Sequence, residues 1–359
     1  MLKKIKEVVF GMILGLGLFG LVSCSTPQPE KKPDDSSTTT RREELSNQFL
    51  AAANEVVISD SSVTFKDANQ KEMTLMKNPK KVCNLYASFT TLWYEAGGVV
   101  SGCIGGTSSI DLYKEYIGRD ITTDEGVTIL ATTSSGSKWS IETILASQPD
   151  LIICSTAMSG YKTISGPAEA ANIPCVAMNY DDFSDYLKWF KVFSSLTGNE
   201  NLWESIALKS LNDVIDVIVE VERLEGPSVF CMFSGTKSFQ ANTINTVAGA
   251  MIEQLGGKNI VSSWANDTQA ERLEINLEAV YAGKPTMILI QCHATKTEVS
   301  EFLQEIYGDN PLWNAICSSI GENIFYLEKT LFHNKPNSKF ALAYQTLAKI
   351  LYPTHTFSF

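Results

Sequence analysis

Histidine and arginine are scarce in this chain, which has three histidines and five arginines among its 359 residues. Three histidines leave little room for a Ser-His-Asp triad, and neither a G-x-S-x-G nor an H-E-x-x-H motif occurs. Carboxylates are plentiful, with 40 Asp and Glu, but no motif pairs them. These absences argue against a hydrolase or a zinc peptidase.

Basic runs are lacking beyond the first few residues, and the formal net charge is −11. Proteins that bind nucleic acids need clustered Lys and Arg to contact phosphates. We therefore expect no nucleic-acid partner.

The sequence has no C-x-x-C motif, which argues against a zinc ribbon or a thioredoxin-like redox site. Seven cysteines follow Cys24, and an odd number cannot all pair within one chain. Most of them lie in or beside apolar runs, as buried small side chains do. They are Cys83, Cys103, Cys154, Cys175, Cys231, Cys292 and Cys317.

Only the N-terminus carries a long apolar stretch, and a basic start precedes it. The stretch is too short to span a bilayer, so residues 1–23 are predicted to be a secretory signal peptide. The ending "LVSC", Leu21 to Cys24, resembles the lipobox of bacterial lipoproteins. This resemblance implies an exported protein that a lipid on Cys24 anchors to a bacterial membrane. A plain signal peptide with an incidental cysteine is the alternative.

Residues 24–54 are rich in Pro, Ser, Thr and charged side chains and show no apolar periodicity. Such a composition favours disorder, because it offers little apolar surface to bury. We predict a disordered tether between the membrane and a folded body.

One pattern occurs twice, 136 residues apart. "SIETILASQPDLIIC" spans residues 140–154, and "NLEAVYAGKPTMILI" spans residues 276–290. Each copy has a short amphipathic helix, a proline and then an apolar strand, and the alignment superposes Glu142 on Glu278. The repeat predicts two similar lobes with a working site between them.

Strands and helices alternate on either side of one long helical segment, which predicts an α/β fold with mostly parallel sheets. Residues 55–198 are the predicted N-terminal lobe and residues 226–359 the C-terminal lobe. Residues 199–225 contain neither proline nor glycine, and their apolar residues recur at helical spacing, so they are predicted to form the helix between the lobes.

Ligands of open α/β sheets bind outside the carboxyl ends of the strands. The residues that follow the predicted strands or flank the repeat helix are therefore candidate ligand contacts. They are Tyr86, Trp139, Tyr161, Phe239, His293, Phe332 and His333. Trp139 would stack on a flat macrocycle or a catechol. The alternative for Trp139 is a core residue at the edge of a lobe.

His293 and His333 lie in two loops predicted to face the gap between the lobes. A neutral imidazole can be an axial ligand of iron or cobalt, and Phe332 gives His333 an aromatic neighbour. Polar loop residues without a ligand role are the alternative. A receptor for bare Zn or Mn would need about three or four converging ligands, which two histidines do not supply.

The candidate loops contain lysines and no arginine. A highly anionic ferric catecholate needs several cationic partners, so a neutral or weakly charged chelate, a corrinoid or haem is favoured. The lysines are Lys138, Lys162, Lys237, Lys296, Lys329 and Lys335.

An ordered set of stretches, from about Val56 to Pro353, resembles the binding proteins of ABC importers for cobalamin, haem and iron–siderophore complexes. The stretches are "VTFKDANQKEMTLMKNPKKVCNLY", "SIETILASQPDLIIC", "GNENLWESIALKSL", "EQLGGKNIV", "NPLWNAICSSIGENIFYL" and "AYQTLAKILYP". The resemblance implies two Rossmann-like three-layer lobes joined by a rigid helix, the class III periplasmic-binding-protein architecture. "KPTMI" departs from the family's usual Pro-Asp in the second repeat copy.

The same resemblance implies the partners. They would be an ABC permease with its ATPase, and a small metal chelate or macrocycle captured between the lobes of a monomer without a cofactor of its own. Glu142 and Glu278 match the family's docking glutamates; the alternative is that each acid merely stabilises the start of a helix. A surface receptor of the same fold for another small molecule is the competing function. A metal-cluster enzyme component is a further alternative, since Cys154 and Cys292 end corresponding strands.

Overall fold

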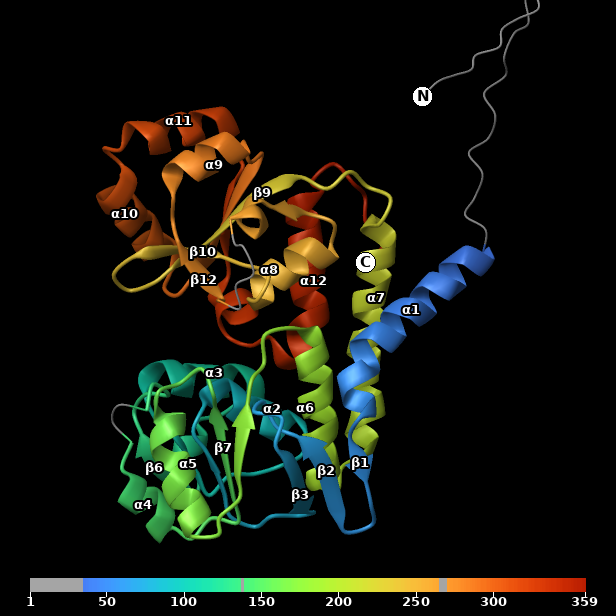
Figure 1. Cartoon of the computed structure of the whole chain (residues 1–359), viewed down its shortest axis with the longest axis vertical. Helices are drawn as coiled ribbons and strands as arrows, with labels where there is room; N and C mark the ends of the chain where they lie inside the picture. Colours follow the sequence, from blue (N-terminus) through green and yellow to red (C-terminus); the bar gives the residue numbers. More distant parts are fainter. Residues whose placement is uncertain (1–34, 137–138, 265–269) are drawn as a thin grey trace, which may run out of the picture.

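The computed structural model describes residues 35–136, 139–264 and 270–359. The predicted signal peptide, Cys24 and Lys138 lie outside the described residues. Two α/β lobes are stacked along the long axis of the molecule, and helices α6, α7 and α12 run beside them (Figure 1). This is the predicted fold class.

The first lobe is built on a five-stranded parallel sheet in the order β6-β5-β4-β7-β8. Its strands are β4 (Val82–Asn84), β5 (Gly102–Ile104), β6 (Thr128–Ala131), β7 (Leu151–Ser155) and β8 (Cys175–Met178). Its helices are α2 (Ala87–Glu95), α3 (Thr107–Ile117), η1 (Ile121–Thr123), α4 (Ile141–Ala146), α5 (Gly160–Ala170) and α6 (Phe183–Leu196). The strand order reverses between β4 and β7, which is where doubly wound sheets bind ligands.

A separate antiparallel sheet precedes this lobe. It consists of β1 (Val57–Ile58), β2 (Ser62–Lys66) and β3 (Glu72–Met76). β2 and β3 form a hairpin that turns at Asp67, and the Asp67 carboxylate accepts the backbone N–H groups of Asn69 and Lys71 at 2.8 and 2.9 Å. An aspartate that bonds its own turn in this way specifies the hairpin locally.

The second lobe has a mixed sheet in the order β12-β10-β9-β13-β14, with β11 also paired to β9. Its strands are β9 (Ser228–Ser234), β10 (Phe239–Asn242), β11 (Lys258–Asn259), β12 (Arg272–Glu274), β13 (Met287–Cys292) and β14 (Ile324–Leu327). Its helices are α8 (Val247–Gln254), η3 (Ile260–Ser263), α9 (Leu277–Gly283), α10 (Lys296–Tyr307), α11 (Pro311–Ile320), η4 (Lys329–His333), η5 (Asn337–Lys339) and α12 (Phe340–Leu351).

The long helix between the lobes runs from residue 201 to residue 221. It begins with a wide π-helical segment, η2 (Trp203–Leu208), and continues as α7 (Lys209–Val221). One core cluster extends from the first lobe through α6, α7 and α12 into the second sheet, with Phe193, Val217, Leu289 and Tyr344 among its members. A large apolar contact of this kind favours small relative motions of the two lobes.

The tether predicted over residues 24–54 is wrong from Asp35 onward, because residues Asp35–Asn54 form helix α1. Leu45, Phe49 and Ala53 are buried on one narrow stripe of α1. α1 packs on α6 and α7 (Figure 1), and the Phe49 ring meets the Phe183 ring edge-on with centroids 5.3 Å apart. Tertiary packing therefore stabilises a helix that has little apolar surface of its own.

The internal repeat folds as the same unit in both lobes. α4 leads to β7 in the first lobe, and α9 leads to β13 in the second. The superposed residues Gln148 and Lys284 both have positive φ, 51° and 45°, directly before a proline. All seven described cysteines are free thiols.

Candidate functional site

Three side chains of the second lobe meet around the ring of Phe233, near the carboxyl end of β9. The His333 ring stacks on Phe233 with centroids 5.4 Å apart and planes 13° apart. The Arg272 guanidinium carbon lies 4.3 Å from the Phe233 centroid, and the His293 ring lies edge-on at 6.4 Å. His293 Nδ1 is 3.5 Å from the Ser234 hydroxyl. We call Phe233, Arg272, His293 and His333 the stacked cluster.

The stacked cluster forms because four strand ends converge. Phe233 and Gln291 are paired across β9 and β13 and so lie on the same face of the sheet. His293 follows β13, and His333 ends η4, the turn that follows β14. Arg272 begins β12, beyond β10 in the strand order.

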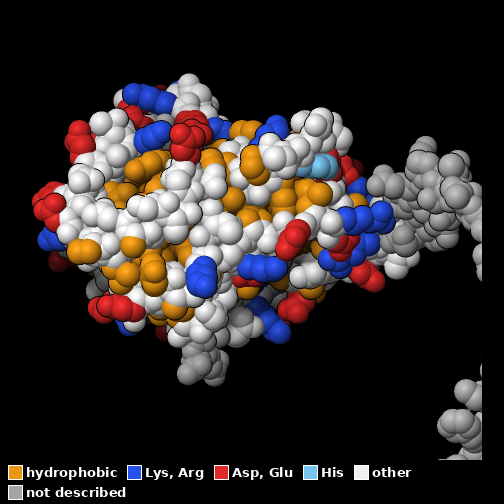
Figure 2. Space-filling model, turned by 90° about the horizontal axis from the view of Figure 1, so that it is seen from above, with side chains coloured by type: hydrophobic (Ala, Val, Ile, Leu, Met, Phe, Trp, Pro, Cys, Tyr) orange, Lys and Arg blue, Asp and Glu red, His pale blue; other side chains and the backbone are white. Residues whose placement is uncertain are grey.

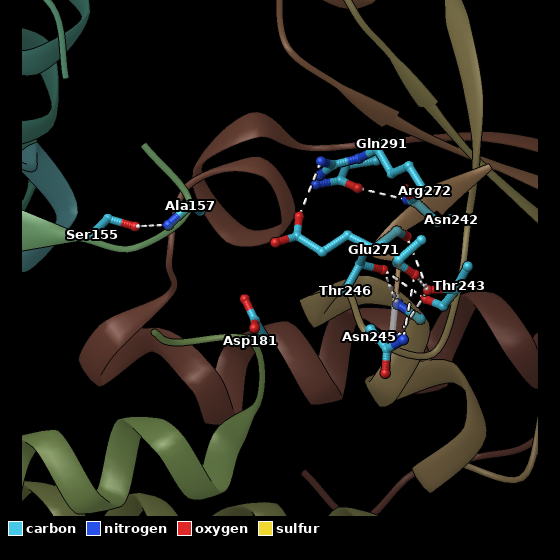
Figure 3. A network of polar contacts seen from close by, with 12 residues as sticks. Ser155, Ala157, Asp181, Asn242, Thr243, Asn245, Thr246, Glu271, Arg272 and Gln291 are labelled. Carbon is cyan, nitrogen blue, oxygen red and sulfur yellow. Dashed lines mark hydrogen bonds and ion pairs between the residues drawn. The ribbon is translucent and has the colours of Figure 1, made fainter. Parts of the chain in front are cut away.

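A polar network supports this face (Figure 3). Asn242 Nδ2 donates to Gln291 Oε1 at 2.6 Å, and Gln291 Nε2 donates to the Phe332 carbonyl at 2.6 Å. Arg272 Nη1 donates to Glu271 at 3.2 Å. In Figure 3 the Arg272–Glu271 pair lies on the side of the second lobe that is turned toward Ser155, Ala157 and Asp181 of the first lobe.

Two nitrogen atoms of the stacked cluster are buried without a hydrogen-bond partner among the described residues, His333 Nδ1 and Arg272 Nε. Buried polar atoms in folded proteins are nearly always paired, so these two nitrogens are candidates for contact with a ligand or water. Burial, together with electrostatic repulsion from the basic groups Lys329, Arg272, His293 and Lys335, lowers the pKa of His333 to about 4. The imidazole is therefore neutral at physiological pH and can act as a metal ligand.

A hollow adjoins the cluster at the carboxyl ends of β13 and β14. It has a volume of about 600 Å³ and is lined by His293, Lys296, Glu298, Tyr326 and Lys329, among others. Lys296 lies 5.4 Å from the centroid of the Tyr326 ring. The hollow thus combines an aromatic surface with cationic side chains.

Three of the predicted contacts lie elsewhere. Trp139 is a core residue of the first lobe, 8% exposed, and its indole N–H donates to the Thr133 carbonyl at 3.1 Å. Tyr161 turns to the hairpin, where its hydroxyl accepts from Asn69 at 2.6 Å. Phe239 is buried against Phe302 in the second lobe.

Tyr86 and Phe332 occupy intermediate positions. Tyr86 precedes α2 and is half-buried in the first lobe, where its ring lies 4.6 Å from the Phe89 ring with the planes inclined by 48°. Phe332 is 1% exposed, so its ring belongs to the core. Its backbone carbonyl accepts the hydrogen bond from Gln291 and so takes part in the polar network. Of the seven predicted contacts, only His293 and His333 lie together in the stacked cluster.

Sequence reasoning missed Phe233 and Arg272. The prediction that lysines supply all positive charge at the site is wrong, because Arg272 stacks on Phe233 beside His333. Arg272 begins the strand β12 and neither follows a strand nor flanks the repeat helix, so the sequence rule does not select it. Of the predicted lysines, Lys329 and Lys335 lie close enough to His333 to lower its pKa, and Lys162 and Lys237 are exposed.

Glu142 and Glu278 have matching environments. Each is exposed in the first turn of a short helix, α4 or α9, and each helix has a side-chain N-cap, Ser140 or Asn276. Both helices lie on the side of their lobe away from α7 (Figure 1). The repeat therefore presents one carboxylate from each lobe.

Neither a membrane-crossing helix nor a metal-binding group of three or more His, Cys, Asp and Glu occurs within the described residues. On the face shown in Figure 2, acidic and basic side chains are interspersed. This surface offers no basic stripe of the kind that tracks a phosphate backbone.

A family model described as periplasmic binding protein matches residues 113–330. A curated relative, the uncharacterized ABC transporter substrate-binding lipoprotein YvrC of Bacillus subtilis (strain 168), is 23% identical over 226 residues. That alignment covers 61% of this chain and 68% of the relative.

Two solved structures illustrate the similarity of fold. S. aureus IsdE complexed with heme is 16% identical with a TM-score of 0.61, and the match covers 76% of this chain and 98% of that chain. The periplasmic vitamin B12 binding protein BtuF of Vibrio cholerae is 15% identical with a TM-score of 0.58, and covers 76% and 96%.

Proposed function

This chain belongs to the periplasmic binding protein family, and we propose that it captures a haem-, iron–siderophore- or cobalamin-type ligand between its lobes for an ABC importer. In this role it binds and releases its ligand without covalent chemistry, through different affinities in different states. A permease with its ATPase receives the ligand.

The stacked cluster is the observation that carries the proposal. It offers a neutral imidazole with an unpaired nitrogen at His333, an aromatic ring at Phe233 and a cationic group at Arg272. A flat metal macrocycle needs these three features: an axial donor, a stacking surface and a partner for a carboxylate. The similar folds that bind haem and vitamin B12 support this ligand class.

Export and anchoring complete the proposal. The predicted lipidation of Cys24 fits the lipoprotein description of the curated relative. The anchor would keep a monomeric receptor at the outer side of a bacterial membrane, and Glu142 and Glu278 would dock the two lobes onto the permease.

A ligand panel tests the proposal on the chain from Ser25 on, which retains every described residue. Tryptophan fluorescence and visible spectra are followed as haem, cobalamin, cobinamide, and hydroxamate and catecholate iron complexes are added. We expect submicromolar saturation by one class. His333→Ala should abolish the spectral shift if haem or a corrinoid binds, whereas the control His355→Ala, in the C-terminal tail and bonded to Glu220, should leave the shift unchanged. Saturation by none of these compounds would refute the ligand class.

A further inference from the structure

The segment from Glu328 to Lys339, which carries His333, crosses from the second lobe to the first. We call this segment the strap. Next to His333 it is tied to the second lobe, because the Phe332 carbonyl accepts from Gln291 of β13. The Gln291 side chain in turn accepts a hydrogen bond from Asn242 of β10. This bond fixes the orientation of the Gln291 amide that holds the strap.

The other half of the strap is tied to the first lobe. Its contacts are Lys335 with Asp181 (3.4 Å), the Pro336 carbonyl with Tyr116 Oη (3.0 Å), Asn337 Nδ2 with the Ser88 carbonyl and Thr91 Oγ1 (3.0 and 2.7 Å), Ser338 N and Oγ with Glu95 (3.2 and 2.7 Å) and Lys339 with Glu115 (2.5 Å). Thr330 adds a bond to Glu115 before His333. Asn337 is fully buried with φ 51°, so its neighbours hold it in an otherwise unfavourable conformation.

His333 therefore lies between the strap's hydrogen bond to the second lobe at Phe332 and its continuous run of bonds to the first lobe from Lys335 on. We propose that the strap couples the imidazole of His333 to the contact between Glu95 and Ser338, so that loosening this contact moves the imidazole. By reciprocity, a ligand held on His333 would tighten the same contact.

The loss of the proton from Glu95 supplies a way to loosen the contact. Burial raises the pKa of Glu95 to about 7, although both Ser338 donors and the Lys339 ammonium favour the charged form. The phenols of Tyr116, Tyr180 and Tyr186 also face Glu95, and burial raises the pKa of each of them, so they remain neutral near pH 7.

The sign follows from linkage. In a separated junction Glu95 would be solvated, with its ordinary pKa of 4.5, so the closed junction is the form that binds the proton. The contact is therefore strongest below pH 4.5 and weakens as the pH rises through about 7. His333 stays neutral in that upper range, because the pKa of its imidazole is about 4.

Histidine NMR measures the coupling on ligand-free protein. The chain from Ser25 on, labelled at histidine Cε1 and carrying His293→Gln to remove the neighbouring imidazole, is titrated from pH 5 to 9. We expect the His333 signal to shift with a midpoint near 7, the pKa of Glu95. Glu95→Gln should abolish this step, and the exposed Glu322→Gln control should retain it.

A second variant keeps the test decisive if Glu95→Gln does not fold. Ser338→Ala removes a hydroxyl that favours the charged carboxylate, so it should move the midpoint upward. A His333 signal without a step, or a step that survives Glu95→Gln or keeps its midpoint in Ser338→Ala, would overturn the coupling. The inference rests on the proposed function only in treating His333 as a ligand contact. If the His333 signal shows no pH step but a compound of the ligand panel binds, the coupling fails and the proposed function stands. If the step is present but no compound binds, the proposed ligand class fails and the coupling stands.

Discussion

At the scale of single residues, Arg272 changes what the site can bind. Its guanidinium stacks on Phe233 with Nε unpaired, and one amino group is shared with Glu271. A planar cation held in this way is suited to a carboxylate, because its remaining donors are already oriented. The scarcity of arginine therefore does not restrict the ligand to neutral chelates.

Arg272→Gln should weaken the binding of haem, which carries two carboxylates, by ~10–100-fold, the equivalent of one charge-assisted hydrogen bond. Binding of cobinamide, whose side chains are amides, should change much less. Titration of both ligands against both variants measures the difference. Arg223→Gln, at an exposed position beyond the end of α7, is the matched control. Equal losses for the two ligands would assign Arg272 a structural role instead.

The histidines show what sequence can predict at this scale. His293 and His333 were predicted because they follow strands, and parallel strands bring their carboxyl ends to one edge of a sheet. Trp139 is predicted for a different reason, because it flanks the repeat helix, and the close approach of its ring to Gly160 places it in the core. The end of a strand or helix gives the edge where a residue lies and does not give the direction of its side chain.

At the scale of elements, α1 is the main departure from the sequence prediction. Its buried residues Leu45, Phe49 and Ala53 recur every four positions and form a single stripe in a segment that is mostly polar before Phe49. The groove between α6 and α7 that receives this stripe is made by residues more than a hundred positions away. A local window cannot detect such a partner, whereas the helix-proline-strand repeat was visible because its pattern is local.

Removing α1 should destabilise the protein. A chain that starts at Glu55 should lose more than ~3 kcal/mol of unfolding free energy relative to one that starts at Asp35, because losing a buried Phe alone costs ~3–5 kcal/mol. Urea denaturation followed by tryptophan fluorescence measures the difference. If both chains unfolded at the same urea concentration, α1 would not contribute to the folded body.

The repeated left-handed residues provide a second test of elements. Gln148→Gly and Lys284→Gly should each stabilise the protein by about 0.5–1 kcal/mol, because glycine adopts positive φ without strain. The two β-branched variants, Gln148→Val and Lys284→Val, should each cost about 1–2 kcal/mol. Glu301→Gly, in the middle of α10, is the control and should cost about 1 kcal/mol. Thermal unfolding gives all five values, and a gain at only one repeat position would show that the two turns differ.

At the scale of the whole molecule, the repeat presents one exposed carboxylate from each lobe. A partner that binds both carboxylates must have two cationic sites at a fixed separation. Docking then depends on how the two lobes are placed relative to each other. The core that continues from one lobe into the other keeps this placement nearly constant.

Reversing both charges should separate binding from transport. In Glu142→Lys with Glu278→Lys, ligand affinity should be unchanged, and uptake by cells should fall at least about tenfold, the effect of ~1.4 kcal/mol in docking. The control reverses Glu43 and Glu204, which are exposed on α1 and η2. Undiminished uptake in the Glu142 and Glu278 double variant would favour a receptor that does not dock through these residues.

The packing of α1 on α6 and α7 also sets the reach of the molecule. Helix α1 begins at Asp35, so eleven peptide steps separate Cys24 from the folded body, and a chain of that length extends at most about 40 Å. With the lipid that we propose on Cys24, the folded body stays within that distance of the membrane surface. Permease and receptor then meet at a local concentration in the millimolar range, as linked partners do. Weak docking suffices at such a concentration, and weak docking lets an emptied receptor leave quickly and make room for a loaded one.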